Sequence, residues 1–524
     1  MRQTKIFYYS LSIILGLMMI NMNGCSDTRI KISASKRVLE NGLTVIVKED
    51  HKSPLFTIDT WVKAGYYNEP DSVTGISHLL EHMFFKGTEK RGLGEIKGDT
   101  KKLGGRFNAG TIYEHTHYYT ILPSEYLEEG VEIQSDALRN STFDDEELSK
   151  EKEVVVQEIK RKYDNPSQYS YEKMLDLMFD THRMGRWRMG TPEQVRGISR
   201  NELVDYYKKY YTPDNVILVV VGDVDSSEVY SLIEKYYGDW SSPECKKEIS
   251  PSESVQRQLR HEIMRSDIKQ PYIYMGFKTP GMLNEDTYAL QILAYVLGRG
   301  KSSRLYKGIV EELQWASTAA CELYALEDLG ILNINVQPMG ENIIDIENEV
   351  FGQIRLIKER GIPESELSKA KNNLESAYLF GMEEVTNQSE QLAIFEQYGD
   401  YKYLDEHLLK LNAVTVADIK RVAEDYLDIS KCSIIEHLPD DMRVEKLKDE
   451  EYAKILSNAY ARFSIDTSED TECLRPTGTN IDRDDFPPVK FTLSDNKKII
   501  IKENHSLPIV SVMIGFKGGR CFET

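Results

Sequence analysis

The stretch that decides the fold is His78-Leu79-Leu80-Glu81-His82. It lies in a segment with helical spacing of apolar residues, predicted as a helix over Ser72–Phe85. On a helix, His78 and His82 are one turn apart, so both imidazoles project from the same face and can bind one metal ion. Glu81 lies beside them, where a carboxylate can take a proton from a metal-bound water. The stretch therefore predicts a catalytic metal centre of the zinc type, with an open coordination position.

A third ligand is expected on a second helix, predicted over Asp144–Tyr163. With 10 histidines in 524 residues, the motif arises by chance in about one such chain in fifty, so it needs support from elsewhere. Glu151 and Glu158 lie two turns apart on one face of this helix, with Val154 and Val155 between them to bury that face. Most glutamates on such a helix are solvated, but the valine pair favours an inward-facing Glu158.

The surrounding pattern alternates helix and strand, which is typical of a mixed sheet with helices on one face. Alternating apolar and polar residues around Asn41-Gly42 predict a hairpin over Arg37–Lys48. Further strands are predicted over Leu55–Val62, Phe107–Leu122 and Val216–Val221. After a linker at Ser241–Ser254, a second domain with a similar order of elements is predicted, with strands at Tyr272–Phe277 and Ile331–Val336 and helices at Tyr288–Val296, Ile343–Arg360 and Glu364–Phe380.

The last residues repeat an N-terminal segment. Residues 490–523 match residues 36–69 at a constant offset without a gap. We interpret this as the start of a second copy of the whole unit. Either the reading frame is truncated or the segment docks onto another molecule; truncation is favoured, because a lone hairpin with an exposed edge is a poor end for a fold.

The predicted fold is therefore α+β, with two homologous domains that each hold a mixed β-sheet covered by helices, as in one half of a clamshell. The truncated start of a third domain follows. The predicted boundaries are a signal peptide at 1–25, a catalytic domain at 29–245, a second domain at 255–445, an acidic linker at 446–488 and the repeat at 489–524.

The chain is acidic and poor in cysteine. Its formal net charge of -20 argues against binding to nucleic acid or anionic lipid, because phosphate repels it, and hints at basic or neutral peptides as ligands. The six cysteines lie far apart, without CxxC pairs, in a chain too large to need disulfides. Only Cys25 carries a specific prediction.

The N-terminus has the pattern of an export signal. A basic start precedes an apolar run over Ile6–Ile20 that is short for a membrane span. The sequence Met22-Asn23-Gly24-Cys25 resembles a bacterial lipobox, although Met22 and Asn23 depart from the usual pattern, and it predicts lipidation of Cys25. Ordinary signal cleavage and an uncleaved anchor are the alternatives. Each places the rest of the chain outside the cytoplasm, in the bacterial periplasm or at the outer membrane.

Several further motifs match one family. They are Gly75, Phe84–Thr88, Gly104–Ala109, Thr116–Tyr119, Tyr211–Asn215 and Val221–Asp223. With these motifs, the sequence resembles the pitrilysin family of inverted zinc metallopeptidases, which includes insulin-degrading enzyme and mitochondrial processing peptidase. The resemblance implies one zinc ion per chain bound by His78, His82 and Glu158, with Glu81 as general base and Glu151 as the carboxylate that orients a ligand.

The resemblance also implies that a peptide or unfolded polypeptide binds along an edge strand beside Asn108 and Ala109. The alternative for Asn108 is a turn residue after Gly104-Gly105. Members of the family complete their site with an Arg and a Tyr from the opposite half of a closed chamber, and the corresponding stretch Val310–Ser317 contains neither.

We therefore expect a zinc metalloendopeptidase. The alternative is a non-catalytic or partner-dependent subunit, for which a partner chain would supply the missing half. A zinc-storage protein fits poorly, because a storage site has no use for Glu81.

Overall fold

The computed structural model describes residues 33–463, apart from 242, 247, 249, 445, 446 and 448, together with 489–492, 498–502 and 510–513. The predicted signal peptide at 1–25, with Cys25, lies outside the described residues. So does most of the acidic stretch 446–488. Within the described part of the chain, no helix combines the length and the apolar character needed to cross a membrane.

The first domain is built on a six-stranded mixed sheet with the spatial order β1-β2-β6-β3-β5-β4. Strands β2 and β6 are parallel, and all other neighbouring pairs are antiparallel. The predicted hairpin is confirmed by the pairing of β1 with β2. The strands are β1 Ser35–Val38, β2 Thr44–Glu49, β3 Leu55–Val62, β4 Arg106–Thr111, β5 Thr116–Pro123 and β6 Val216–Gly222.

One predicted strand is wrong. The segment Phe107–Leu122 is not continuous but forms the antiparallel hairpin of β4 and β5. The chain turns at residues 112–115, where the backbone N–H of Ile112 donates to the carbonyl of His115. The turn makes β4 the outer strand of the sheet, and among the described residues no strand pairs with its other edge.

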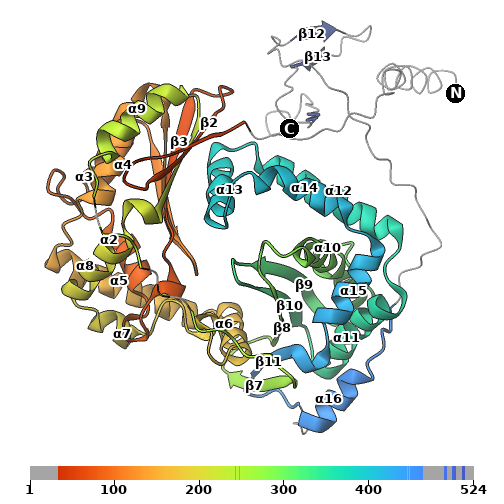
Figure 1. Cartoon of the computed structure of the whole chain (residues 1–524). Coiled ribbons are helices and arrows are strands. Elements are labelled where there is room, and N and C mark those ends of the chain that lie inside the picture. Colours follow the sequence, from red (N-terminus) through yellow and green to blue (C-terminus); the bar gives the residue numbers. More distant parts are fainter. Residues whose placement is uncertain are drawn as a thin grey trace, which may run out of the picture. The chain divides into compact units, whose positions relative to one another are not determined.

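Helices cover one face of this sheet, and Figure 1 shows α4 and α9 lying along it. The core between the two layers includes Phe56 and Ile58 from β3, Leu80 from α2 and Val155 from α5. The helices of this part are α2 Ile76–Met83, α3 Glu95–Lys102, α4 Leu127–Arg139, α5 Asp145–Tyr163, α6 Pro166–Met178, α7 Pro192–Gly197, α8 Arg200–Tyr210 and α9 Ser226–Tyr237.

The second domain repeats the topology of the first apart from β1, which has no counterpart in the second sheet. Its five strands have the order β7-β11-β8-β10-β9, again with one parallel pair, β7 and β11, followed by antiparallel neighbours. Helices α10, α11 and α15 cover one face. The elements are β7 Arg260–Ser266, β8 Tyr272–Pro280, β9 Ala316–Ala325, β10 Leu329–Pro338, β11 Cys432–Pro439, α10 Asp286–Gly298, α11 Ile343–Arg360, α12 Glu364–Gly381, α13 Val385–Gln397, α14 Tyr403–Ala413, α15 Val416–Tyr426 and α16 Asp449–Ser457.

The two domains exchange one helix each. Helix α6 packs on the second sheet, where Met174 and Met178 contact a cluster that contains Tyr274 of β8 and Ile435 of β11. Helix α13 packs on β3 and β6 of the first sheet. Each sheet thus has its own helices on one face and a helix of the other domain on the opposite face.

The described part of the acidic stretch 446–488 is not extended. Tyr452 and Leu456 of α16 are buried in the core of the second domain. Gln353 of α11 donates to the carbonyl of Phe463 at 2.7 Å. Residues 449–463 therefore pack with the second domain.

The repeated sequence at the end of the chain forms a repeated hairpin. Strand β12 Val489–Thr492 pairs antiparallel with β13 Lys498–Ile501, with Lys490 opposite Ile500. In the first domain, Lys36 lies opposite Ile46. The register of this hairpin equals that of β1 and β2 at every paired position, so the sequence repeat is also a structural repeat.

Candidate metal centre

Helix α2, which carries the motif, begins later than its sequence pattern suggests. The helix starts at Ile76 because Gly75 has a left-handed conformation with φ of 94°. A Cβ atom at Gly75 would lie 2.3 Å from the carbonyl oxygen of Met189, so only glycine fits this turn. The buried carboxylate of Glu69 accepts hydrogen bonds from the backbone N–H groups of Gly75 and Ser77 at 2.8 and 2.9 Å. These contacts fix the N-terminus of the helix.

Three predicted ligands converge on one point. Oε2 of Glu158 lies 3.6 Å from Nε2 of His78 and 3.6 Å from Nε2 of His82. All three donor atoms lie within 4.8 Å of one another, and they form the one such group of potential metal-binding side chains within the described residues. Because α2 and α5 pack together, residues far apart in the sequence meet here.

The carboxylate that supports His82 is Glu151, which lies on the same face of α5 as Glu158. Its Oε2 lies 3.0 Å from Nδ1 of His82, which leaves Nε2 of this imidazole to face Glu158. Its Oε1 accepts a hydrogen bond from Nζ of Lys86, and Lys86 lies 3.9 Å from Oε2 of Glu147. The contact with Glu151 thus orients the ring of His82.

The electrostatics of this group favour a cation. Burial opposes the charged form of His82, but the hydrogen bonds with Glu151 and Glu158 outweigh it and raise its pKa to about 9. Burial and the neighbouring His82 lower the pKa of His78 to about 4, so His78 is neutral and its lone pair is available. Two carboxylates around His82 attract positive charge, as a metal site requires.

The spacing also suits zinc. In a tetrahedral zinc site with bonds of about 2.1 Å, neighbouring donor atoms lie about 3.4 Å apart. The distances of 3.6 Å from Glu158 to the two imidazoles differ from this by only a few tenths of an ångström. Nδ1 of His78 is buried and lacks a hydrogen-bond partner in the described structure. The donor set of two imidazoles and one carboxylate therefore fits a catalytic zinc ion.

Glu81 lies on the same helix turn and has a partner that the sequence did not indicate. The hydroxyl of Thr111, on β4, donates to Oε2 of Glu81 at 2.7 Å. Burial raises the pKa of Glu81, despite this hydrogen bond. A buried carboxylate with one oxygen engaged is suited to act as a base through the other oxygen.

Asn108 and Ala109 lie in strand β4 and not in a turn. Asn108 is exposed and lies opposite Tyr119, whereas Ala109 lies opposite Tyr118 and packs against the core. Since β4 is an outer strand that contacts α2, its free edge runs beside the helix that carries His78 and Glu81.

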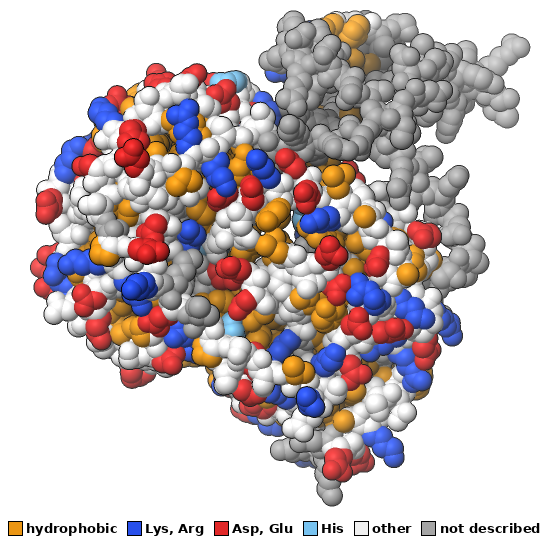
Figure 2. Space-filling view, viewed as in Figure 1, with side chains coloured by type: hydrophobic (Ala, Val, Ile, Leu, Met, Phe, Trp, Pro, Cys, Tyr) orange, Lys and Arg blue, Asp and Glu red, His pale blue; other side chains and the backbone are white. Residues whose placement is uncertain are grey.

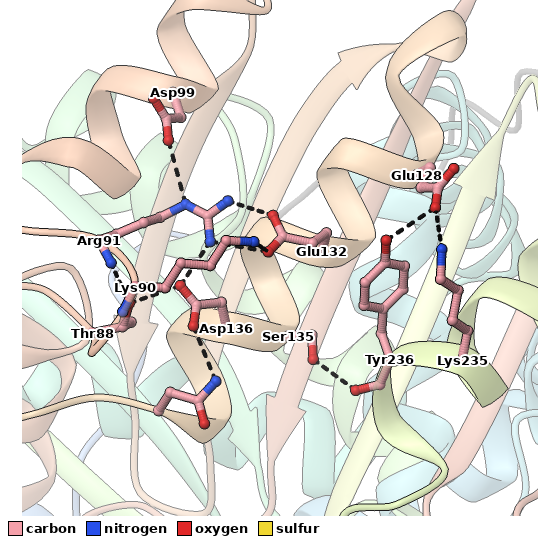
Figure 3. A network of polar contacts seen from close by, with 11 residues as sticks. Thr88, Lys90, Arg91, Asp99, Glu128, Glu132, Ser135, Asp136, Lys235 and Tyr236 are labelled. Atoms are coloured by element: carbon pink, nitrogen blue, oxygen red, sulfur yellow. Dashed lines mark hydrogen bonds and ion pairs between the residues drawn. The ribbon is translucent and has the colours of Figure 1, made fainter.

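The loop after α2 is held by a network of charges (Figure 3). Arg91 is buried and forms ion pairs with Asp99 at 3.3 Å and Asp136 at 2.7 Å, and a third with Glu132. Glu132 and Asp136 belong to α4, and Thr88 donates to Asp136 at 2.7 Å. The network thus fastens the C-terminal side of α2 to the helix layer.

Comparison with known proteins agrees with this arrangement. The model of the insulinase family, peptidase family M16, matches residues 44–192, which contain all four residues of the candidate centre. The model of the peptidase M16 inactive domain matches residues 197–374. The chain belongs to the M16 peptidase family. The pitrilysin-type resemblance and the α+β fold of two helix-covered sheets are therefore confirmed for this M16 chain.

Individual relatives cover most of the M16 chain. An uncharacterized zinc protease, YmxG, of Bacillus subtilis is 29% identical over 74% of this chain and 95% of its own length. The zinc protease PqqE of Helicobacter pylori is 26% identical over 74% of this chain and 89% of its own. A crystal structure of a protease from H. pylori has a TM-score of 0.75 and 25% identity, and covers 78% of this chain and 100% of that one.

A further structure shows how the fold relates to a longer protein. The first half of the periplasmic protease PqqL from Escherichia coli matches with a TM-score of 0.69 and 20% identity, over 83% of this chain and 97% of that half. The two helix-covered sheets of this chain thus correspond in fold to one half of a larger M16 protein.

Proposed function

We propose that this chain is a zinc metalloendopeptidase that hydrolyses peptides or unfolded polypeptides. The observation that carries the proposal is the convergence of His78, His82 and Glu158 beside Glu81. The first three would hold one zinc ion, and the names of the relatives from B. subtilis and H. pylori, both zinc proteases, support this choice of metal.

The chain's own residues would divide the work as follows. When bound, zinc makes a water molecule more acidic and polarises the scissile carbonyl. Glu81 accepts a proton from that water through the oxygen not engaged by Thr111, and then passes it to the leaving amine. Burial of Glu81 raises its pKa, so it holds the proton more firmly than a solvated carboxylate does. Glu151 keeps His82 in a fixed orientation.

The substrate would lie along β4. This strand has a free edge, so an extended peptide adds to the sheet by main-chain hydrogen bonds. Asn108 and Ala109 lie on this strand, three and two residues before Thr111, the partner of Glu81. The scissile bond of a peptide in this position would therefore pass beside the candidate centre.

The second candidate function is a partner-dependent subunit. It is favoured by the stretch Val310–Ser317, which lacks the Arg and Tyr expected from the family resemblance. In the structure, this stretch begins within a π-helix over Tyr306–Glu312 and continues into β9. A partner chain that carries the missing pair would then complete the site.

For location, we propose export to the bacterial periplasm, with lipidation of Cys25. The basic and apolar start of the sequence supports the proposal. The test is the mass of the mature N-terminus and the incorporation of labelled fatty acid. Label that persists in Cys25→Ser contradicts lipidation at this position.

The test of function combines metal content with hydrolysis of a quenched peptide library. The wild type is expected to bind one zinc ion and to lose activity after chelation. Glu81→Gln is expected to bind zinc and to lose activity by about 10²–10⁴-fold, because the base is gone. The control is Glu125→Gln, an exposed residue of the same domain, which is expected to act as the wild type.

The outcomes separate the two functions. Zinc binding without hydrolysis favours the partner-dependent subunit, and activity that appears on addition of a partner chain supports it. Hydrolysis that survives both chelation and Glu81→Gln refutes the zinc peptidase.

A further inference from the structure

A cavity adjoins the candidate metal centre at the junction of α5 and α6. It has a volume of about 480 Å³, and His78 and Glu158 form part of its wall. The rest of the wall includes Arg161 and Lys162 at the end of α5 and Gln168 in the first turn of α6. A group bound in this cavity lies directly next to the residues that would hold zinc.

The charges around this cavity do not cancel. Nζ of Lys162 lies 2.8 Å from Oε1 of Glu172, but Nε of Arg188 lies 2.7 Å from the same oxygen. Two cations thus share one carboxylate, whose side chain is only 1% exposed and cannot turn outward to a ligand. This trio leaves one positive charge behind the cavity wall.

Arg161 adds a second positive charge at the cavity. Its guanidinium contacts Glu158 at 3.5 Å, through Oε1, the oxygen that does not face the imidazoles. The side chain of Arg161 is 73% exposed, so it is free to turn toward a ligand. A zinc ion held by Glu158 would itself offset the charge of that carboxylate, which makes the cavity more positive.

The positive charge at this cavity is opposite in sign to the net charge of the whole protein. The formal net charge is -20, and the face seen in Figure 2 mixes acidic and basic side chains. The acidic composition suggested basic ligands, but a cavity wall with excess positive charge favours an acidic ligand at this position. Guanidinium and ammonium groups bind carboxylates by charge-assisted hydrogen bonds.

We propose that this cavity binds an anionic group of the substrate, a carboxylate close in sequence to the bond that is cleaved. The carboxylate belongs to an acidic side chain or to the C-terminus of the peptide. Arg161 contacts it directly, and Lys162 and Arg188 provide the positive field behind it. The proposal rests on the proposed function, and it names the substrate class of the same site.

The test measures binding of labelled peptides to the zinc-loaded Glu81→Gln protein, which retains the cavity but does not cut. One peptide series carries Glu, Gln or Lys in turn at each position near its centre, and a second compares a free C-terminal carboxylate with an amide. The Glu peptide is expected to bind about tenfold more tightly than the Lys peptide at the position that reaches the cavity. If only the second series shows a preference, the source of the carboxylate is the chain terminus.

The decisive variant is Arg161→Glu, made in the same background. It is expected to reverse the preference, so that the Lys peptide binds more tightly. The matched control is Lys160→Glu, which changes the same charge on an exposed neighbour outside the cavity wall and is expected to keep the preference. Lys162→Gln is expected to reduce the preference without reversing it, because Arg161 remains.

Equal affinities in both series, or a preference that Arg161→Glu leaves unchanged, overturn the proposal. The failure of the proposed function has a different signature, since it is measured by hydrolysis with the wild type. Hydrolysis without any preference overturns only the anionic cavity. A preference that follows Arg161, without hydrolysis, overturns only the peptidase.

Discussion

The sharpest prediction concerns Glu151, which touches a candidate ligand but not the metal. Glu151→Gln keeps the size of the side chain and one acceptor oxygen, but removes the charge. The contact of 3.0 Å with Nδ1 of His82 becomes a neutral hydrogen bond, which is weaker by about 1 kcal/mol. Lys86 keeps only Glu147, at 3.9 Å, so its charge repels the metal by about 1 kcal/mol more. The sum of about 2 kcal/mol corresponds to about 30-fold weaker zinc binding.

The assay is competition for zinc against a chelator of known affinity, with hydrolysis measured per bound zinc ion. The control is Glu147→Gln, which removes a carboxylate near Lys86 but leaves His82 untouched, and it is expected to weaken zinc binding by less than about threefold. If Glu151→Gln bound zinc as tightly as the wild type, the idea that Glu151 orients His82 would be refuted. An equal loss in both variants would assign the effect to charge alone.

Three further predictions concern stability. Burial raises the pKa of Glu114 from 4.5 to about 7. Its contribution to the free energy of unfolding is therefore fully present below pH 4.5 and is lost as the pH rises through 7. Denaturant unfolding is expected to show that the free energy of unfolding falls by up to about 3 kcal/mol between about pH 5 and pH 8, and that this fall is absent in Glu114→Gln. Gly75→Ala places a Cβ 2.3 Å from the carbonyl of Met189 and is expected to cost at least about 2 kcal/mol, measured by thermal unfolding. Arg91→Met removes the cation that Asp99, Glu132 and Asp136 share, and of these the buried Asp136 keeps no other ion-pair partner among the described residues. The change is expected to cost about 3–5 kcal/mol, whereas the exposed Lys90→Met costs under about 1 kcal/mol in the same measurement.

Local patterns predicted the fold well where the apolar spacing of an element is regular. The strand Leu55–Val62 and the helix Ile343–Arg360 have the predicted bounds, because their apolar spacing is regular. The first helix was predicted to start at Ser72 and starts at Ile76, because Gly75 takes up a conformation that breaks the helix. Regular spacing was no guide to the turn that divides β4 from β5.

At the candidate site, contacts between residues far apart in the sequence limited what the sequence alone could predict. The motif and the spacing on α5 indicated His78, His82 and Glu158, which the structure brings together. Thr111 could not be found in the same way, because a threonine in a strand carries no signal of its neighbour across the sheet. Glu69 did have a signal, since it recurs at the equivalent position of the repeated segment.

The exchange of α6 and α13 has a mechanical consequence, because the two joints differ in chemistry. Helix α6 is anchored by methionine and leucine side chains that are fully buried. Helix α13 meets the first sheet through polar contacts, such as Ser389 with Asp59 at 3.3 Å and Gln397 with Trp61. Water can replace hydrogen bonds at little cost but cannot replace an apolar contact. Helix α6 also makes polar contacts, such as Ser170 with His437 at 2.8 Å, but its apolar side chains hold it in addition. Under strain, we therefore expect the joint at α13 to open before the joint at α6, with residues 166–178 as the pivot.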